Sequence, residues 1–364
     1  MSITRINIGP IHPSTHGVCR LVVDVDGDTI VKVEPHIGFL HRGVEKLVEN
    51  RMYMQCPPYM EKLDYVAPMS MDDLYVGAVE AALGVEVKER AKYVRVILLE
   101  LQRLASHLFL IGSVGNDLGL MFTMFMWAFK DRDLILKLLE EATGQRMFYV
   151  NMRLGGLVNT LPKDFEEHTI DTLEGLEKRL KKYQAFLEKN PIFIERMKGV
   201  GVLKKEDAID LGVTGPVLRA SGVRYDVRKN NPYYVYRELN FSEKVLYDGD
   251  NLARFRVRIL EMYESMRLIR AAFEKMPEGD EKGMPIRLIT PKAKNRIVVV
   301  NREVPRGEGL IYMVADPEKA YRLSIRAPSF INLAALEHIT KGARIADLFA
   351  IFGSLDLVMA DVDR

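Results

Sequence analysis

Two histidines, His12 and His16, stand four residues apart near the start of the chain, in the stretch G-P-I-H-P-S-T-H-G at positions 9–17. Histidine changes its charge near neutral pH, so such a pair can bind or transfer protons. Pro13 lies between the two rings, and one helix face cannot carry both rings across a proline. The sequence therefore predicts a loop. It has either a chemical role or the plainer role of a turn whose histidines are solvated or bonded locally.

The segments on either side of this loop must position it. Residues 3–8 and 18–25 are rich in β-branched and other apolar residues, and Asp26-Gly27-Asp28 is a turn signal before a third such segment at 29–33. Short apolar segments separated by turn signals are typical of strands. We expect a small antiparallel sheet with the histidine loop at its tip.

The composition excludes several classes of protein. The chain has 364 residues, 48% of them hydrophobic, which is enough for a large core. Lys plus Arg number 52 against 50 Asp plus Glu, so the formal net charge is +2 and no region has the basic excess of a nucleic-acid binder. The two cysteines, Cys19 and Cys56, have no C-x-x-C spacing. We therefore expect a reducing compartment, and no thiolate-bound metal or iron–sulfur cluster held by this chain alone.

One segment, residues 108–129, has the length and apolar composition of a membrane span. Its centre is Gly115-Asn116-Asp117-Leu118-Gly119, and a charged side chain between helix breakers is costly at the middle of a bilayer. We interpret the segment as two buried helix ends that meet at a polar break. The first residues lack the apolar core of a signal peptide, so we expect no export.

The middle of the chain has the pattern of long helices. The strongest is expected at 88–113, where apolar residues occur on nearly every side, as in a helix buried in a core. Further helices are expected at 71–83, capped by Asp72 or Asp73, and at 121–143, 164–188 and 251–275. Strand patterns return at 286–289, 296–300, 309–314 and 320–325, before short helices at 332–339 and 346–352.

These elements predict an α+β fold, with a central up-and-down helical bundle flanked by small antiparallel β regions at the N- and C-terminal ends. We expect three regions. Residues 1–70 form an α+β region with the histidine loop, residues 71–283 form the bundle, and residues 284–364 form a β-rich region with the terminal helices. No repeat or long linker separates them.

Two sets of charged residues fall inside this scaffold. Glu100, Arg103 and His107 form one polar stripe on the most apolar helix, which predicts an internal ladder of ion pairs. The glycine-punctuated loop at 214–228 carries arginines and aspartates that we expect to pack against protein or an anion. Nucleotide-binding G-x-G-x-x-G and P-loop motifs are absent, as are H-E-x-x-H and serine-elbow motifs, so nucleotide-binding and hydrolase functions are not supported.

Several long motifs together resemble one known family: the catalytic D-type, quinone-reducing core subunit of complex I (NADH:quinone oxidoreductase), which is related to the large subunit of nickel–iron hydrogenases. The likeness covers essentially the whole chain, in order. Its motifs are H-P-S-T-H-G at 12–17, H-R-G-V-E-K at 41–46, L-D-Y-V at 63–66, Arg103 with S-H-L at 106–108, G-P-V-L-R-A-S-G-V at 215–223, S-L-D at 354–356 and V-D-R at 362–364. The resemblance implies a fold like that of the hydrogenase large subunit.

The chain departs from the hydrogenase branch at the metal. Hydrogenases of this clan bind nickel and iron with two C-x-x-C pairs, and here Asp64 and Ala67 stand at the early pair and Val358 and Asp361 at the late pair. None of the four is a thiolate, so the resemblance implies no metal in this chain and a pocket left for an organic or sulfur acceptor.

The resemblance also implies roles for single residues. His16 and Tyr65 would hold the quinone headgroup as hydrogen-bond donors, and Asp117 would pair with His16 and raise its pKa. Arg42 would lie near a 4Fe-4S cluster that the adjoining small subunit binds. His12 would support the loop or contact the acceptor. Independently of the resemblance, the Met- and Phe-rich composition of the helix at 121–143 indicates that Met121 and Met124, with Phe125, either form an adaptable apolar wall for a ligand or pack in the core.

The implied function is electron transfer from the partner's cluster to a quinone, with protonation and ion pumping by membrane subunits. The chain would be one peripheral subunit, without a transmembrane segment, on the cytoplasmic face of the cell membrane. The chain's length resembles archaeal members of the clan. This favours an alternative in which ferredoxin or a reduced deazaflavin feeds a complex that reduces sulfane sulfur or polysulfide, with Cys19 or Cys56 near the site. A second alternative is a structural docking subunit without a catalytic site.

Overall fold

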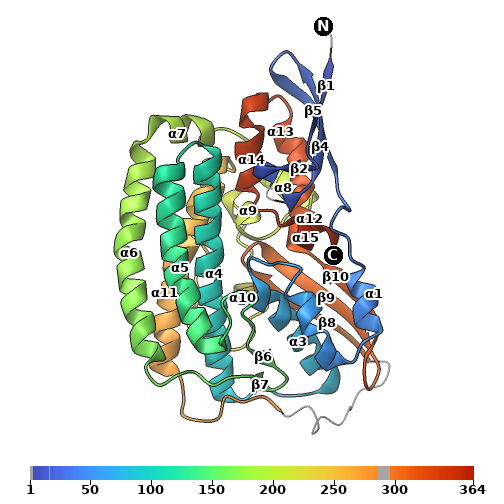
Figure 1. Cartoon of the computed structure of the whole chain (residues 1–364), viewed down its shortest axis with the longest axis vertical. Coiled ribbons are helices and arrows are strands. Elements are labelled where there is room, and N and C mark those ends of the chain that lie inside the picture. Colours follow the sequence, from blue (N-terminus) through green and yellow to red (C-terminus); the bar gives the residue numbers. More distant parts are fainter. Residues whose placement is uncertain (1–2, 16, 285–295) are drawn as a thin grey trace.

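The computed structural model describes residues 3–15, 17–284 and 296–364. Four long helices lie side by side on one side of the molecule (Figure 1). They are α4 (Glu89–Asp117), α5 (Met126–Thr143), α6 (Phe165–Lys189) and α11 (Asn251–Lys275), and α7 (Pro191–Met197) follows α6 at one end of them. The predicted α+β class with its central bundle is confirmed.

Helix α4 is apolar on nearly every side because it has neighbours on nearly every side. It packs against α5, α11 and α14 (Leu348–Ser354), whereas α6 has an exposed polar face at the edge of the bundle. The ends of α5 and α11 have ordinary caps: Gly144 follows α5 with φ 78°, and the Asp250 side chain accepts a hydrogen bond from the Ala253 N–H at 2.7 Å.

The predicted polar break at the end of α4 is present. Helix α4 ends at Asp117, and α5 begins only at Met126, after a π-helical turn at Met121–Phe125. The helix expected from residue 121 therefore has a widened first turn. No helix among the described residues is both long and apolar enough to cross a membrane.

The N-terminal sheet forms as predicted. It has the order β1 (Thr4–Ile8), β4 (Arg20–Asp26), β5 (Thr29–His36), with antiparallel neighbours. The histidine stretch connects β1 to β4 at one end of this sheet. It contains a short ribbon of β2 (Ile11–His12) and β3 (Gly17–Val18), joined through a 3-10 turn at Pro13–Thr15.

The C-terminal sheet is antiparallel with the order β10 (Ala320–Arg326), β9 (Gly307–Ala315), β8 (Arg296–Val304), and each strand covers one predicted at 296–300, 309–314 or 320–325. The strand predicted at 286–289 lies outside the described residues. Helix α3 (Pro68–Leu83) packs against β8 and β9, and α1 (Val44–Glu49) packs against β10. The boundaries at 70 and 283 stay a prediction.

The predicted cap of α3 is wrong. The helix begins at Pro68, a residue that favours the first helical position, so Asp72 and Asp73 lie inside it and are fully buried. The segment expected to be a loop at 214–228 contains two short helices, and the helix expected at 332–339 is divided in two. The remaining α-helices and β-strands of the described residues are α2 (Pro57–Met60), β6 (Met152–Arg153), β7 (Gly156–Leu157), α8 (Lys205–Asp210), α9 (Gly215–Ala220), α10 (Val227–Asn230), α12 (Pro328–Leu333), α13 (Ala335–Thr340) and α15 (Met359–Asp363).

Two glycines hold the turn between β8 and β9 against α9. A Cβ on Gly215, which has φ 68°, would lie 2.4 Å from the Cα of Gly307. Only glycine allows this approach of the two backbones. The approach positions Arg306, the residue before Gly307, in the interior of the molecule.

Candidate functional site

A cavity of about 350 Å³ opens where the histidine loop, the α4–α5 connection and the C-terminal segment meet. Its walls are mostly apolar, with a few polar groups that converge on it, which is the usual character of a small-molecule site. The lining residues are Pro13, Gly17, Tyr65, Val66, Phe109, Leu110, Ser113, Asn116, Asp117, Phe125, Phe129, Arg306, Asp356, Leu357 and Val358.

Two of the three predicted catalytic residues are brought together at this cavity. Tyr65 lies in the connection between α2 and α3, and Asp117 is the last residue of α4. Burial raises the pKa of the Tyr65 hydroxyl, so the group keeps its proton at neutral pH and can donate a hydrogen bond. Tyr65 is still 42% exposed, which leaves it accessible from the cavity.

The third predicted residue, His16, lies outside the described residues. The loop itself reaches the cavity, because Pro13 and Gly17 line it. Thr15 is buried, and its hydroxyl lies between the backbone oxygens of His12 and Gly17, at 2.7 and 2.8 Å, where its single proton can be donated to either. The placement of His16 against Tyr65 and Asp117 therefore stays a prediction.

The structure places His12 away from the cavity lining. Its ring stacks on Phe349 of α14 with the ring centres 4.7 Å apart, and its Nδ1 accepts a hydrogen bond from the Ser14 N–H at 3.2 Å. These contacts fix the loop on the C-terminal helices. The support role that we expected as one option for His12 matches this geometry.

The other predicted contact residues also lie off the cavity wall. Arg42 is exposed and donates to the backbone oxygen of Lys62 at 2.9 Å. Met124 is fully buried against α4, whereas Met121 is 47% exposed. Of the two options for the methionines, Met124 thus packs in the core, and the apolar wall of the cavity includes Phe125 and Phe129, whose ring centres are 4.3 Å apart.

Sequence reasoning missed Arg306, which lies at the floor of the cavity. Its Nη1 is 2.6 Å from Asp64 Oδ2 and 3.3 Å from Ser106 Oγ, and its Nη2 is 3.5 Å from Asp356 Oδ1. Burial alone would lower the pKa of this guanidinium, but the neighbouring carboxylates Asp356 and Asp64 raise it above its ordinary value. Arg306 is thus a fixed cation beside the acceptor space.

Asp64 and Asp361, which the sequence resemblance matches to metal-binding thiolates of hydrogenases, lie behind this arginine. Burial raises the pKa of both carboxyl groups, and that of Asp361 reaches about 6. Val358, at a third such position, lines the cavity. Among the described residues, no group of three or more His, Cys, Asp or Glu side chains is arranged to hold a metal ion.

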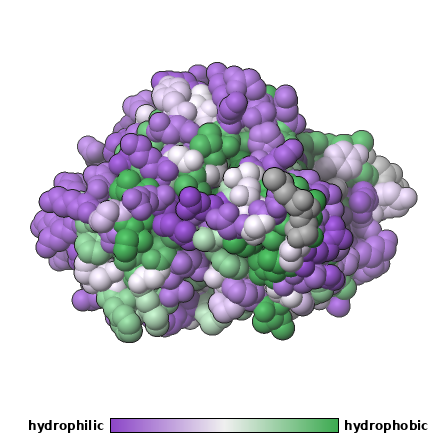
Figure 2. Space-filling view, turned by 90° about the horizontal axis from the view of Figure 1, so that it is seen from above, coloured by the Kyte–Doolittle hydropathy of each residue, from purple (hydrophilic) through white to green (hydrophobic). Residues whose placement is uncertain are grey.

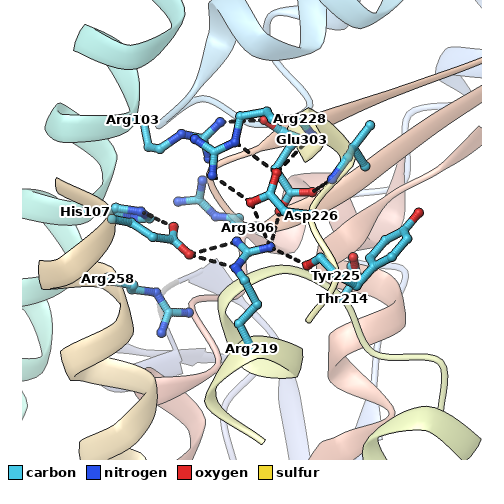
Figure 3. Close-up of polar contacts among 12 residues, drawn as sticks. Arg103, His107, Thr214, Arg219, Tyr225, Asp226, Arg228, Arg258, Glu303 and Arg306 are labelled. Atoms are coloured by element: carbon cyan, nitrogen blue, oxygen red, sulfur yellow. Dashed lines mark hydrogen bonds and ion pairs between the residues drawn. The ribbon is translucent and has the colours of Figure 1, made fainter. Parts of the chain in front are cut away.

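A larger charged network fills the core next to this floor (Figure 3). Arg219 of α9 contacts Glu261 at 2.8 Å, Glu303 at 2.8 Å and Asp226 at 3.1 Å. The charged side chains of the segment at 214–228 thus pack against other parts of the protein. The predicted ladder on α4 is present in part: Arg103 forms an ion pair with Glu100 at 3.1 Å, whereas His107 makes a hydrogen bond to Glu261 of α11 at 3.0 Å.

The negative charge of one carboxyl group in this network, that of Glu303, is only weakly stabilised by its neighbours. Burial and the nearby Asp226 raise the pKa of Glu303 to about 7, although Arg219 opposes that shift. Glu100, in contrast, has its pKa lowered to about 2, because Arg103 and Arg228 outweigh the effect of its burial. Burial lowers the pKa of His107, so its imidazole is neutral at neutral pH.

Neither cysteine belongs to the site. Cys19 and Cys56 are fully buried and neither is among the described residues that line the cavity. Burial raises the pKa of the Cys19 thiol to about 11 and also raises that of Cys56. Both thiols are therefore poor nucleophiles.

Comparison with known proteins gives relatives that all belong to one kind of respiratory-chain subunit. The family described as "Respiratory-chain NADH dehydrogenase, 49 Kd subunit" matches residues 117–298 and 288–364. The D subunit of NADH-quinone oxidoreductase from Dehalococcoides mccartyi is 45% identical over 363 residues, covering 99% of this chain and 98% of the relative. The protein of the same name from Geobacter sulfurreducens is 41% identical over 386 residues, covering 100% and 99%.

A solved structure has nearly the same fold. It is a chain of the membrane-bound sulfane sulfur reductase, described as an archaeal respiratory membrane complex, with a TM-score of 0.94, 35% identity and coverage of 100% of this chain and 98% of that one. The order of motifs, the fold and these likenesses agree. The chain belongs to the family of the 49 kDa, or D-type, subunit of respiratory-chain NADH dehydrogenase and is an oxidoreductase subunit of a complex I-like assembly.

Proposed function

We propose that this chain holds the terminal electron acceptor of a complex I-like membrane assembly, and that this acceptor is a quinone. One observation carries the proposal: the Tyr65 hydroxyl, Asp117 and the Arg306 guanidinium converge on one cavity with apolar walls. Aromatic and aliphatic walls suit a flat apolar ring, and the polar groups suit its carbonyl oxygens. The relatives named as D subunits of NADH-quinone oxidoreductase support the same acceptor.

Each polar group has a role in this proposal. Tyr65 donates a hydrogen bond to one carbonyl oxygen, and His16 donates to the other. Negative charge that develops on reduction strengthens both bonds, and Arg306 stabilises that charge from the floor. Asp117 pairs with His16 and raises its pKa, so that the imidazole carries the proton that the reduced headgroup needs.

The electrons come from a partner in this proposal. They are donated by a 4Fe-4S cluster that a small iron–sulfur subunit binds, and Arg42 lies on the side of this chain that faces that subunit. Exposed apolar side chains near the loop and the α4–α5 connection support contacts with further subunits: Ile11, Met121, Phe122, Met126 and Trp127. From above, the molecule shows apolar patches among hydrophilic ones (Figure 2). Membrane subunits pump ions, and this chain is peripheral, on the cytoplasmic face.

A second acceptor has a specific observation in its favour. The chain of the sulfane sulfur reductase complex matches this fold over its whole length, so sulfane sulfur or polysulfide, with ferredoxin as donor, is the alternative acceptor. Cys19 and Cys56 would have no direct part in it, since both are buried away from the cavity wall.

An acceptor assay on the purified complex tests the proposal. The same preparation is reduced through its upstream donor and offered a quinone analogue or polysulfide, with the cluster's reduction followed separately. We expect faster electron transfer to the quinone analogue. Faster transfer to polysulfide would replace the quinone with the sulfur acceptor, and transfer to neither would overturn the catalytic role.

A further inference from the structure

Three carboxyl groups surround Arg306 behind the floor of the cavity, and we call these four residues the floor cluster: Asp64, Asp356, Asp361 and Arg306. All four are buried, with exposures of 0%, 5%, 0% and 1%. The first two carboxylates contact the guanidinium at 2.6 and 3.5 Å. Arg306 and Asp356 also line the cavity, so the cluster and the acceptor share one cation.

The cluster has more acids than cations. Besides Arg306, the cation next to it is Arg258 of α11, whose Nε is 3.6 Å from Asp356 Oδ2. Three carboxylates against two guanidinium groups leave an excess of one negative charge if all are ionised. Such an excess in the interior is costly, and it falls when one carboxyl group binds a proton.

The geometry identifies Asp361 as that group. Asp64 accepts hydrogen bonds from the backbone N–H groups of Val66 and Ala67 as well as from Arg306. Asp361 Oδ2 accepts one from the Ser329 N–H at 3.1 Å, whereas its Oδ1 is buried and has no hydrogen-bond partner among the described residues. Asp356 Oδ2 also has no hydrogen-bond partner among the described residues, but Asp356 has a guanidinium near each oxygen, Arg306 at 3.5 Å and Arg258 at 3.6 Å. Asp361 has no such close cation among the described residues, so its ionised form is the least stabilised of the three.

The further cation next to α15 is Arg364, whose guanidinium stacks over Phe330 of α12 at 4.6 Å and donates to the Ile325 backbone oxygen at 2.8 Å. Helix α12 and strand β3 pack against α15, and neither α12 (Pro328–Leu333) nor β3 (Gly17–Val18) has a charged side chain. On α15 itself, Asp363 is bonded to the Gly38 and Leu40 N–H groups at 2.8 and 2.7 Å. The charged groups that act on Asp361 are thus Asp64, which raises its pKa, and Arg306, which lowers it.

We propose that the floor cluster takes up one proton when the acceptor in the cavity is reduced, and that Asp361 is the group protonated. The inference rests on the proposed function, and it holds whether the acceptor is a quinone or sulfane sulfur. The electron from the partner's cluster stays on the acceptor, and a proton from water binds the Asp361 carboxylate. Negative charge beside Arg306 cancels part of the field of that cation, so the acids behind it bind a proton more tightly.

Before reduction, the Asp361 carboxyl group is mostly ionised and can take up a proton. The pKa of Asp361 is about 6, so at pH 7 about a tenth of the molecules carry the proton. A rise of about two pKa units on reduction would bring that share to about nine tenths.

Infrared difference spectroscopy of the assembled complex tests the inference. The complex is reduced with whichever acceptor it uses, and proton uptake is followed with a pH indicator in weak buffer. We expect a protonated-carboxyl band on reduction that is lost in Asp361→Asn, together with up to one proton of uptake. Asp361→Glu should restore both, with the band shifted. Asp210→Asn, the same change at an exposed carboxyl on α8, should leave both unchanged.

An isotope label gives a second test that does not require any variant to fold. In the unmodified complex grown with aspartate labelled with heavy carbon at its side-chain carboxyl, the band should shift. A band that does not shift, or that persists in Asp361→Asn, overturns the inference while the proposed function stands. If the unmodified complex reduces neither acceptor, both fall together.

Discussion

The Asp64 carboxylate lies 2.6 Å from the Arg306 guanidinium, although the two residues are 242 positions apart in the chain. This contact joins the connection before α3 to the turn between β8 and β9, and it holds Arg306, which lines the cavity together with Tyr65. Because both partners are buried, neither can be solvated if the other is lost.

Replacing Arg306 with Met should destabilise the protein strongly. The change leaves Asp64 buried without its cation, and breaking a buried pair typically costs about 3–5 kcal/mol. Chemical denaturation of the full chain measures the free energy of unfolding. Lys137→Met, which removes an exposed partner of Asp133, should change it by less than about 0.5 kcal/mol. Equal effects of the two variants would contradict the structural role of Arg306.

The Tyr65→Phe variant should reduce the acceptor about ten- to a hundredfold more slowly, because the ring remains but a hydrogen bond to the developing charge is lost. The measurement is turnover of the assembled complex with the quinone analogue, alongside reduction of the partner's cluster by its upstream donor, which should be unaffected. Tyr321→Phe is the matched control, because Tyr321 is 69% exposed on β10. Unchanged turnover in both Tyr65→Phe and His16→Ala would remove these residues from the site.

Replacing Asp117 with Asn should shift the pH profile of turnover. A carboxylate beside His16 raises the pKa of the imidazole, so its loss lowers that pKa. The pH at which activity falls away on the alkaline side should then move down. Initial rates across the pH range measure this shift. An alkaline limb that stays in place would show that Asp117 and His16 are not paired.

Much of the scaffold follows from local patterns. The predicted bounds of α11 match the helix residue for residue. Apolar residues recur there with a helical spacing, and the Asp250 side chain caps the first turn. The predicted start of α3 is wrong because two aspartates resemble caps, although Pro68 sets the first turn and tertiary partners hold the acids. Asp73, for example, contacts Arg302 at 3.2 Å.

The site follows less fully from the sequence. Tyr65 and Asp117 are identified by resemblance, and the structure places both on the cavity. Arg306 has no local signal beyond its place in a Pro-Arg-Gly turn between two strand patterns. Its role depends on contacts with residues far along the chain, and such contacts are set by the packing of α9 and the sheets.

The variant Gly215→Ala should destabilise the protein by several kcal/mol, because the added methyl group would meet the Gly307 backbone at 2.4 Å and must push the Arg306 turn away. Gly84→Ala is a close control. Gly84 has almost the same backbone angle, φ 67° against 68°, but nothing lies within 4 Å of its added Cβ. It should cost only about 1–2 kcal/mol for the left-handed conformation. Thermal unfolding of both variants separates the steric effect from the conformational one.

The stability of the protein should fall with rising pH through the titration of Asp361. Its pKa is about 6 in the folded chain against an ordinary value of 3.8, so between these values the folded state binds the proton that the unfolded state has lost. The carboxyl group therefore costs nothing below about pH 3.8, and above about pH 6 it destabilises by about 3 kcal/mol, of which roughly half develops above pH 5. The free energy of unfolding, measured from pH 4 to pH 8, should decline relative to that of Asp361→Asn by about 2.5 kcal/mol, because the rest of the loss develops below pH 4. If the free energy of unfolding of the unmodified protein stays parallel to that of Asp361→Asn over this range, Asp361 does not titrate in this window. If the unmodified protein instead becomes more stable than Asp361→Asn as the pH rises, Asp361 is stabilised as the carboxylate.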